Sequence, residues 1–229
     1  MSRLPQTIPD QNLYAPLFSP WRGGGAFRRY ADLAAPNTLV SPDRLWVLYS
    51  LALQCLKLDG EFWECGVYKG GTARMLAELL ADHGPTARGL PATILRLFDT
   101  FSGMPSTDPS KDWHRAGDFT DTSALAVRDF VGHGDFVAMH PGWIPQTFLP
   151  LAQAEISFAH VDVDIYQSVL DCCRFILPRL KVGGVIVFDD YGFPTCPGAR
   201  AAVDEYFGAT PYVPLVMPTG QAVVFKSFA

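Results

Sequence analysis

The chain has 229 residues, 48% of them apolar, which is enough to bury the core of one α/β domain. Its 18 Lys and Arg are outnumbered by 23 Asp and Glu and no basic run stands out, so no nucleic-acid partner is expected. No apolar run approaches the ~20 residues of a membrane span, and the N-terminus lacks the apolar core of a signal peptide. The five cysteines show no Cys-x-x-Cys spacing and are expected to be reduced core residues of a cytoplasmic protein.

The first 40 residues are rich in Pro, Gly and aromatic residues, and Trp21–Phe27 is their most flexible part. We interpret residues 1–40 as an arm or lid that covers the substrate or packs against another subunit; a disordered tail is the alternative. Packing against a second subunit, in a homodimer or larger homo-oligomer, is favoured by three apolar side chains: Tyr14, Phe18 and Trp21. Residues 41–229 form the main domain in this interpretation.

A helix is predicted to begin at Ser41–Pro42, where an N-cap residue precedes a first-turn proline. A strand at 61–65 then enters a glycine-rich turn, Gly66–Gly71, which leads into a second helix. The spacing Gly-x-x-x-Gly-Gly differs from the dinucleotide fingerprint, and Glu64 stands where an NAD protein offers backbone donors to a pyrophosphate. A carboxylate there suits a cationic ligand, with a merely tight β–α turn as the alternative.

Residues 93–99 form a second predicted strand, which ends at Asp99. From that position a carboxylate accepts hydrogen bonds from the two hydroxyls of a ribose, although a turn or helix-cap aspartate is the alternative. Residues 102–121 are polar and irregular, and we expect them to form a wall of the active site. A third strand is predicted over 135–140 and ends at His140.

Two further apolar runs of strand length each stop at a pair of acids: Asp162 and Asp164 after the first, Asp189 and Asp190 after the second. Because side chains alternate along a strand, Asp162 and Asp164 are expected on one face roughly 7 Å apart. The second pair can point inward only if its strand ends there. Four carboxylates repel one another unless some are protonated or a cation lies among them, and oxygen ligands favour a hard ion such as Mg²⁺ or Mn²⁺.

The rest of the chain completes an α/β pattern. Helical spacing over 165–177 is closed by Pro178, and a last helix is predicted to begin at Pro197. Strands over 212–217 and 222–226 are separated by so short a turn that they form a hairpin, so the otherwise parallel sheet is expected to finish with antiparallel strands.

Six motifs occur in an order that resembles class I S-adenosylmethionine-dependent methyltransferases. The chain is most similar to the macrocin O-methyltransferase family, the metal-dependent sugar O-methyltransferases of antibiotic biosynthesis. The motifs are ECGVYKGG (64–71), FDTFSGMP (98–105), GWIPQTF (142–148), HVDVDIY (160–166), FDDY (188–191) and PGARAAVDEY (197–206). The resemblance runs from about Ser41 to the C-terminus, and it departs at Ser102, where the family usually has an acid.

The resemblance implies a Rossmann-like class I methyltransferase fold with a mostly parallel seven-stranded sheet and an antiparallel C-terminal strand. It implies that Asp162, Asp189 and Asp190 hold Mg²⁺ and that Asp164 is the general base. The residues implied to bind S-adenosylmethionine are Glu64, Gly66, Tyr68, Gly70, Asp99, Thr100, Phe101, His140 and Asp162. The acceptor would be a small molecule with hydroxyl groups, such as a glycoside.

Other functions remain open at this point. In a nucleotide-sugar glycosyltransferase, an Asp-x-Asp motif would hold a metal-bound diphosphate, which explains Asp162 and Asp164 but leaves Glu64 without a role. A phosphatase of the Asp-x-Asp nucleophile type should carry that motif near the start of its fold. A non-catalytic adenosine-binding module leaves the four acids without a purpose, and a methyltransferase could also act on a catechol-like or other small diol.

Overall fold

A seven-stranded sheet lies at the centre of the computed structural model, which describes residues 19–23 and 25–227. Its strand order is β3-β2-β1-β4-β5-β7-β6. The strands are β1 (Glu61–Cys65), β2 (Leu95–Asp99), β3 (Val137–Pro141), β4 (Ile156–Val161), β5 (Leu180–Phe188), β6 (Leu215–Val216) and β7 (Ala222–Phe225). The first five are parallel, whereas β7 pairs antiparallel with both β5 and β6. This arrangement confirms the predicted fold class and its C-terminal hairpin.

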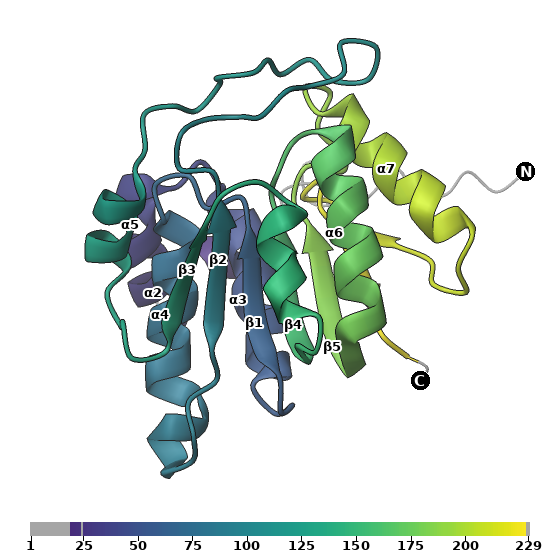
Figure 1. Ribbon diagram of the computed structural model, residues 1–229. Coiled ribbons are helices and arrows are strands. Elements are labelled where there is room, and N and C mark those ends of the chain that lie inside the picture. The colour runs from purple at the N-terminus through teal and green to yellow at the C-terminus, as the bar shows by residue number, and fades with distance from the viewer. Residues whose placement is uncertain (1–18, 24, 228–229) are drawn as a thin grey trace, which may run out of the picture.

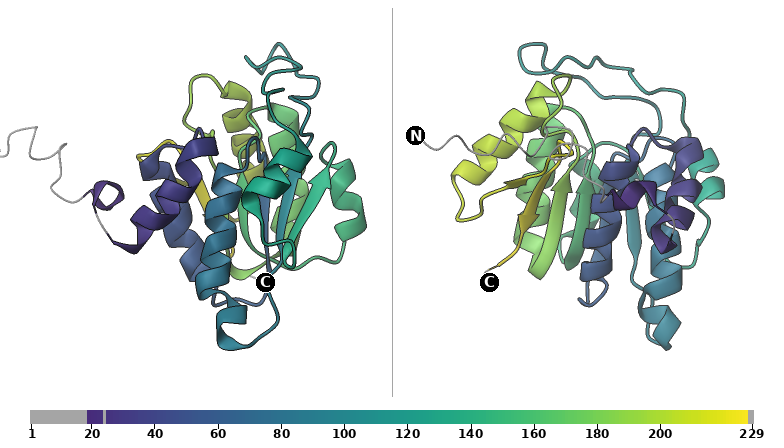
Figure 2. Two further views of the ribbon diagram at one scale, coloured as in Figure 1. Left: turned by 90° about the vertical axis from the view of Figure 1, so that its left-hand side faces the viewer. Right: turned by 180° about the vertical axis from the view of Figure 1, so that it is seen from behind.

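Helices cover both faces of the sheet (Figures 1 and 2). They are α2 (Ala26–Ala34), α3 (Pro42–Cys55), α4 (Gly71–His83), α5 (Ala124–Val131), α6 (Tyr166–Arg179) and α7 (Pro197–Gly208), and short 3-10 turns occur at Pro20–Arg22, Ala35–Asn37, Pro85–Arg88 and Gln146–Leu151. The buried side chains of α2 to α5 join one hydrophobic core, and those of α6 and α7 join a second core on the opposite face. No helix in the described part of the chain has the length and apolarity needed to cross a membrane.

The alternation of side chains along β1 shows how the two cores are separated. Phe62 points into the first core, where its ring lies 5.1 Å from that of Phe158. Trp63 points into the second, where its ring centroid lies 4.5 Å from Phe98 and 5.3 Å from Phe148. Burying side chains of this size stabilises the fold by about 1.5–3 kcal/mol each, so β1 is anchored on both faces.

Sequence patterns predicted most of these elements but missed two helices. Helix α6 also continues one residue past Pro178, because a proline this close to the end of a helix removes only one backbone hydrogen bond. Helix α5 lies just after the irregular segment 102–121 and was not predicted, although Ser123 caps it by accepting a hydrogen bond from the Ala126 amide at 3.2 Å.

The second missed helix, α2, lies inside the predicted N-terminal arm. It packs against α4 and α3, and its Phe27 and Tyr30 are 4% and 2% exposed. Tyr30 also donates a hydrogen bond of 2.8 Å to Asp82 on α4. Two aromatic side chains therefore bind this helix to the main domain, so any separate arm must precede it. Residues 1–18, which carry much of the predicted arm, lie outside the described residues.

The carboxyl ends of the parallel strands meet at one edge of the sheet, and the loop between β2 and α5 arches over that edge toward α7 (Figure 1). Strand β4 ends at Val161 and β5 ends at Phe188, so all four predicted acids lie in loops just beyond the strands. The expectation that Asp162 and Asp164 alternate along an extended strand is therefore wrong. Asp164 instead has a φ of 58°, in the left-handed region, which turns the backbone at this point.

Candidate active site

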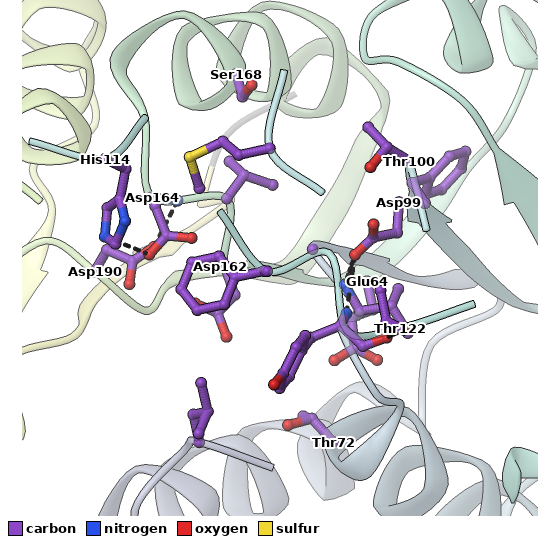
Figure 3. A pocket seen from close by; sticks show the side chains of 18 of the residues that line it. Glu64, Thr72, Asp99, Thr100, His114, Thr122, Asp162, Asp164, Ser168 and Asp190 are labelled. Atoms are coloured by element: carbon purple, nitrogen blue, oxygen red, sulfur yellow. Dashed lines mark hydrogen bonds and ion pairs between the residues drawn. The ribbon is translucent and has the colours of Figure 1, made fainter. Parts of the chain in front are cut away.

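A cavity of about 310 Å³ lies at this edge, beneath the arching loop. It is lined by the glycine turn, by the loops that follow β2, β4 and β5, and by Gly103, Met104, Pro105, His114 and Phe119 of the predicted wall. Its size is within the range of small-molecule sites. Figure 3 shows Glu64, Asp99 and Thr100 toward one side of the cavity and Asp164, Asp190 and His114 toward the other, with Asp162 between them.

Asp99 ties the glycine turn to the loop after β2. Its Oδ2 accepts hydrogen bonds from the backbone amides of Val67 at 2.7 Å and Tyr68 at 2.9 Å, and its Oδ1 accepts one from Phe101 at 2.7 Å. Both Tyr68 and Phe101 have a φ of 51°, so these three bonds hold two strained residues in place. Asp99 lines the cavity, and its proposed contact with a ribose stays a prediction.

Gly66 is required by the close approach of two loops. Its φ is 84°, and a β-carbon added there would overlap the backbone carbonyl of Asp162. The same junction carries a hydrogen bond of 2.8 Å from the Asp162 amide to the Cys65 carbonyl. The turn after β1 and the acidic loop after β4 are thus packed backbone to backbone, and Gly70, also at a φ of 84°, then begins helix α4.

Glu64 is a buried acid with an unpaired oxygen. Its Oε1 lies 3.3 Å from Nδ1 of His160, while its Oε2 has no hydrogen-bond partner within the described residues. Burial raises the pKa of the Glu64 carboxyl. Since Glu64 lines the cavity, a bound group with N–H donors would satisfy the free oxygen, and a cationic donor would also stabilise the charged form.

Asp189 belongs to a buried network behind the cavity. It forms an ion pair with Arg44 of α3, accepts a hydrogen bond of 2.7 Å from Gln221, and lies 3.5 Å from Nε2 of His160. Burial lowers the pKa of His160, but the neighbouring carboxylates of Asp189 and Glu64 outweigh it and raise the pKa to about 10. Burial alone would raise the pKa of Asp189, yet His160 and Arg44 hold it below its ordinary value. The network therefore places Arg44 and His160 beside two buried acids, Glu64 and Asp189.

Asp162, Asp164 and Asp190 form a separate group beside the cavity. One carboxylate oxygen of each lies within 4.8 Å of the others, and Asp190 also accepts a hydrogen bond of 3.0 Å from the Asp164 amide. Burial raises the pKa of all three carboxyls, and the charges of neighbouring acids raise it further. The three cannot all be ionised at low cost without a cation, which is the environment expected of a site for a hard metal ion.

Two side chains that the sequence did not single out contact Asp164. His114, from the arching loop, places Nε2 3.6 Å from Oδ1 of Asp164, and Cys196, at the N-terminus of α7, places its sulfur 3.5 Å from the same oxygen. Burial and the charges of Asp190 and Asp164 raise the pKa of the Cys196 thiol, so it is protonated and donates to Asp164. No local pattern predicts this contact, because the three residues are separated by 32 or more positions in the chain.

The remaining predicted residues divide into two groups. Tyr68 and Thr100 line the cavity along with Glu64, Gly66, Asp99, Asp162, Asp164 and Asp190. The described residues that line the cavity do not include Gly70, Phe101, His140 or Asp189. His140 stacks on Phe98 with ring centroids 4.6 Å apart, and its Nε2 lies 3.4 Å from a guanidinium nitrogen of Arg96. Its predicted contact with the cofactor is untested.

Comparison with known proteins decides which family has this arrangement of strands and acids. The sequence profile of macrocin O-methyltransferase (TylF) matches residues 34–213, which include the glycine turn, Asp99 and all four acids. The chain belongs to the macrocin O-methyltransferase family. The matched span also contains His114 and Cys196.

Two relatives and one solved structure illustrate the similarity to this family. The chain is 30% identical over 162 residues to 8-demethyl-8-(2,3-dimethoxy-alpha-L-rhamnosyl)-tetracenomycin-C 4'-O-methyltransferase of Streptomyces olivaceus, over 66% of this chain and 59% of that protein. It is 30% identical to demethyldecarbamoylnovobiocin O-methyltransferase of Streptomyces niveus, over 65% of this chain and 58% of that protein. The matches span less than two thirds of either relative. The structure of the O-methyltransferase NovP superposes with a TM-score of 0.72 at 24% identity, over 84% of this chain and 83% of NovP, which supports the fold.

Proposed function

We propose that this chain is an S-adenosylmethionine-dependent O-methyltransferase that uses a divalent cation to methylate a hydroxyl of a sugar or of a glycosylated natural product. The observation that carries the proposal is the division of one cavity between two sets of acids, with Glu64 and Asp99 toward one side and Asp162, Asp164 and Asp190 toward the other. Membership of the macrocin O-methyltransferase family supports the same reading.

The first set fits the methyl donor. The unpaired Oε2 of Glu64 is suited to the cationic amino group of S-adenosylmethionine, and the neighbouring glycine turn brings backbone close to the ligand. Asp99 and Thr100, at the end of β2, would face the ribose. Gly66, Tyr68 and Gly70 would support the turn, and contacts from Phe101, His140 and Asp162 complete the proposed set. The sulfonium supplies an electrophilic methyl group.

The second set fits Mg²⁺ or Mn²⁺, because it offers only carboxylate oxygens. Asp162 and Asp190 could bind the metal ion without giving up an ion pair with a basic residue. Asp189, the third proposed ligand, would have to exchange Arg44 for the metal. A bound divalent cation lowers the pKa of a coordinated hydroxyl, which makes an alcohol a better nucleophile.

Asp164 is the proposed general base. Its carboxyl is half-buried at the cavity wall, and burial raises its pKa, which strengthens it as a proton acceptor. His114 and Cys196 both contact its Oδ1 and fix its position. The arching loop, through Met104, His114 and Phe119, would exclude water from the reacting groups.

The names of two relatives indicate which kind of acceptor to propose. One of them is named for methylating a rhamnosyl tetracenomycin at the 4' position, and another for methylating demethyldecarbamoylnovobiocin. We therefore place a glycoside above a catechol-like diol as the acceptor. A nucleotide-sugar glycosyltransferase remains the second candidate only through its Asp-x-Asp motif, and the buried carboxylate of Glu64 at the cavity disfavours a diphosphate there.

The proposal includes the cellular compartment and the oligomeric state of the enzyme. Five free buried cysteines suit a reducing compartment, and we place the protein in the cytoplasm. We further propose that the segment before α2 is a lid or a contact between subunits of a homo-oligomer. Light scattering of the full chain and of a chain that begins at Ser19 tests the second role, since only the full chain should then be oligomeric.

Calorimetry and a methyl-transfer assay test the main proposal. The protein should bind S-adenosylmethionine and not nucleoside-diphosphate sugars, and it should transfer radiolabelled methyl groups to members of a panel of rhamnosylated and other glycosylated natural products. EDTA should abolish transfer and Mg²⁺ should restore it. Transfer that persists in EDTA would refute the metal assignment alone, whereas binding of nucleoside-diphosphate sugars without S-adenosylmethionine would refute the methyltransferase.

A further inference from the structure

We propose that His114, Asp164 and Cys196 form a second cation site, selective for a borderline-soft divalent ion such as Zn²⁺, whose occupation blocks the enzyme. The three side chains offer nitrogen, oxygen and sulfur donors, whereas the neighbouring group of Asp162, Asp164 and Asp190 offers oxygen only. Thiolate and imidazole ligands select zinc and similar ions over Mg²⁺. The two groups of side chains share one residue, Asp164, the proposed base.

The spacing of the three donor atoms is close to that of a zinc site. Nε2 of His114 lies 3.6 Å from Oδ1 of Asp164, and the sulfur of Cys196 lies 3.5 Å from that oxygen and 3.8 Å from that nitrogen. With the usual metal–ligand lengths, a tetrahedral ion holds such donors roughly 3.3–3.6 Å apart. Shifts of a few tenths of an ångström would therefore complete three corners, and a water or a substrate oxygen would take the fourth.

The surroundings of the donors also fit a metal. Nδ1 of His114 lies 3.2 Å from Oδ2 of Asp118, the pairing that orients a zinc-bound imidazole and fixes its tautomer. Cys196 is the residue before the first turn of the 12-residue helix α7, and a divalent ion bound there would displace the proton that its thiol carries in the metal-free protein. All three donor residues line the cavity, so an ion can enter from it.

An ion bound to His114, Asp164 and Cys196 would prevent Asp164 from acting as the general base. An ion bound to Oδ1 of Asp164 withdraws electron density from the carboxylate, so Asp164 accepts the hydroxyl proton less readily, and the ion displaces the Cys196 proton to solvent. This consequence rests on the proposed function, in which Asp164 is the base. Binding itself does not, because it depends only on the donor set.

Cobalt spectroscopy tests the site without any assay of activity. We expect Co²⁺, added as cobalt chloride to the metal-free protein, to give a near-ultraviolet sulfur-to-cobalt charge-transfer band that Cys196→Ser abolishes. Asp118→Asn should weaken Co²⁺ binding about 10–100-fold, the usual effect of losing a partner of a metal-bound histidine. Cys55→Ala, a change at a buried thiol in α3, is the matched control and should keep the band. If Cys196→Ser does not fold, His114→Gln should weaken the band instead.

Zinc inhibition tests the consequence. Micromolar zinc chloride should stop methyl transfer by the wild-type enzyme in the presence of excess Mg²⁺, and Cys196→Ser should resist relative to its own zinc-free rate. No sulfur band in the wild type, or a band that survives in Cys196→Ser, overturns the site. Full recovery of activity on adding more Mg²⁺ would place the zinc at the oxygen-only group and overturn the inhibition. If no methyl transfer is found at all, the cobalt spectrum still decides the binding.

Discussion

The buried His160 predicts a loss of stability as pH rises. The carboxylates of Asp189 and Glu64, acting against burial, raise its pKa to about 10, above the ordinary value near ~6.5. The folded protein therefore holds this proton more tightly than the unfolded chain does. Its stabilising contribution is complete below pH ~6.5 and is lost progressively as pH rises through that value toward 10.

The size of this effect follows from proton linkage. Once only the folded state retains the proton, each further pH unit lowers the free energy of unfolding by ~1.4 kcal/mol. Because half of the unfolded chains still hold the proton at pH ~6.5, the expected loss between pH ~6.5 and ~8.5 is about 2 kcal/mol. The window stops near ~8.5 because cysteine thiols of the unfolded chain begin to ionise there. Burial raises the pKa of several thiols of the folded protein, including Cys55 and Cys173, and these add losses of the same sign above the window.

Urea unfolding across that window, in EDTA, measures the loss. His160→Gln is the matched variant, since glutamine can still hydrogen bond but cannot carry the charge. Its free energy of unfolding should be lower at the acid end and should vary much less with pH than that of the wild type. The pKa values of Asp162, Asp164 and Asp190 are also raised. These acids are present in both proteins, so their effect on the pH dependence cancels when the wild type and the variant are compared. Equal slopes in the two proteins would refute a charged His160.

Three further outcomes are expected. Glu64→Gln should weaken S-adenosylmethionine binding by about 1–3 kcal/mol in calorimetry, the effect of losing a hydrogen bond to a charged group, and unchanged binding would remove Glu64 from the site. Asp164→Asn should keep Mg²⁺ binding while turnover falls roughly 10²–10⁴-fold, as for loss of a general base, whereas Asp190→Asn should lose Mg²⁺ binding too. Arg44→Met should lower the free energy of unfolding by about 3–5 kcal/mol in urea, because Asp189 is left buried without its cation; a smaller loss would mean that His160 and Gln221 suffice.

The fold was predictable because strong local signals agreed with one another. Strand β1 is an apolar run that meets a glycine turn, α3 begins at a serine and a proline, and the C-terminal strands are joined by a short turn. Acids that follow parallel strands must meet at one edge of the sheet, which explains why Asp162 and Asp190 were correctly brought together. Each of these inferences needs only periodicity and neighbours in the chain.

The finer geometry of the site was not predictable because it depends on partners far away in the sequence. Asp189 and Asp190 are adjacent, yet one faces Arg44, 145 positions earlier, while the other faces the cavity. The contact of His114 with Asp164 depends on the path of an irregular loop, which no periodic pattern specifies. Helix α2 was hidden by neighbouring glycines, although its two aromatic residues three apart, Phe27 and Tyr30, were the available signal.

The ion pair between Arg44 and Asp189 provides a counter-ion for a buried acid from within the protein. Where every acid of a metal centre is bare, the ion is needed to hold the chain together, and stripping it unfolds the domain. Here the most deeply buried acid, Asp189, carries its own counter-ion on α3, so its charge is compensated by the protein itself. In the proposed function, removing Mg²⁺ with EDTA would therefore stop methyl transfer without leaving the buried charge of Asp189 unpaired.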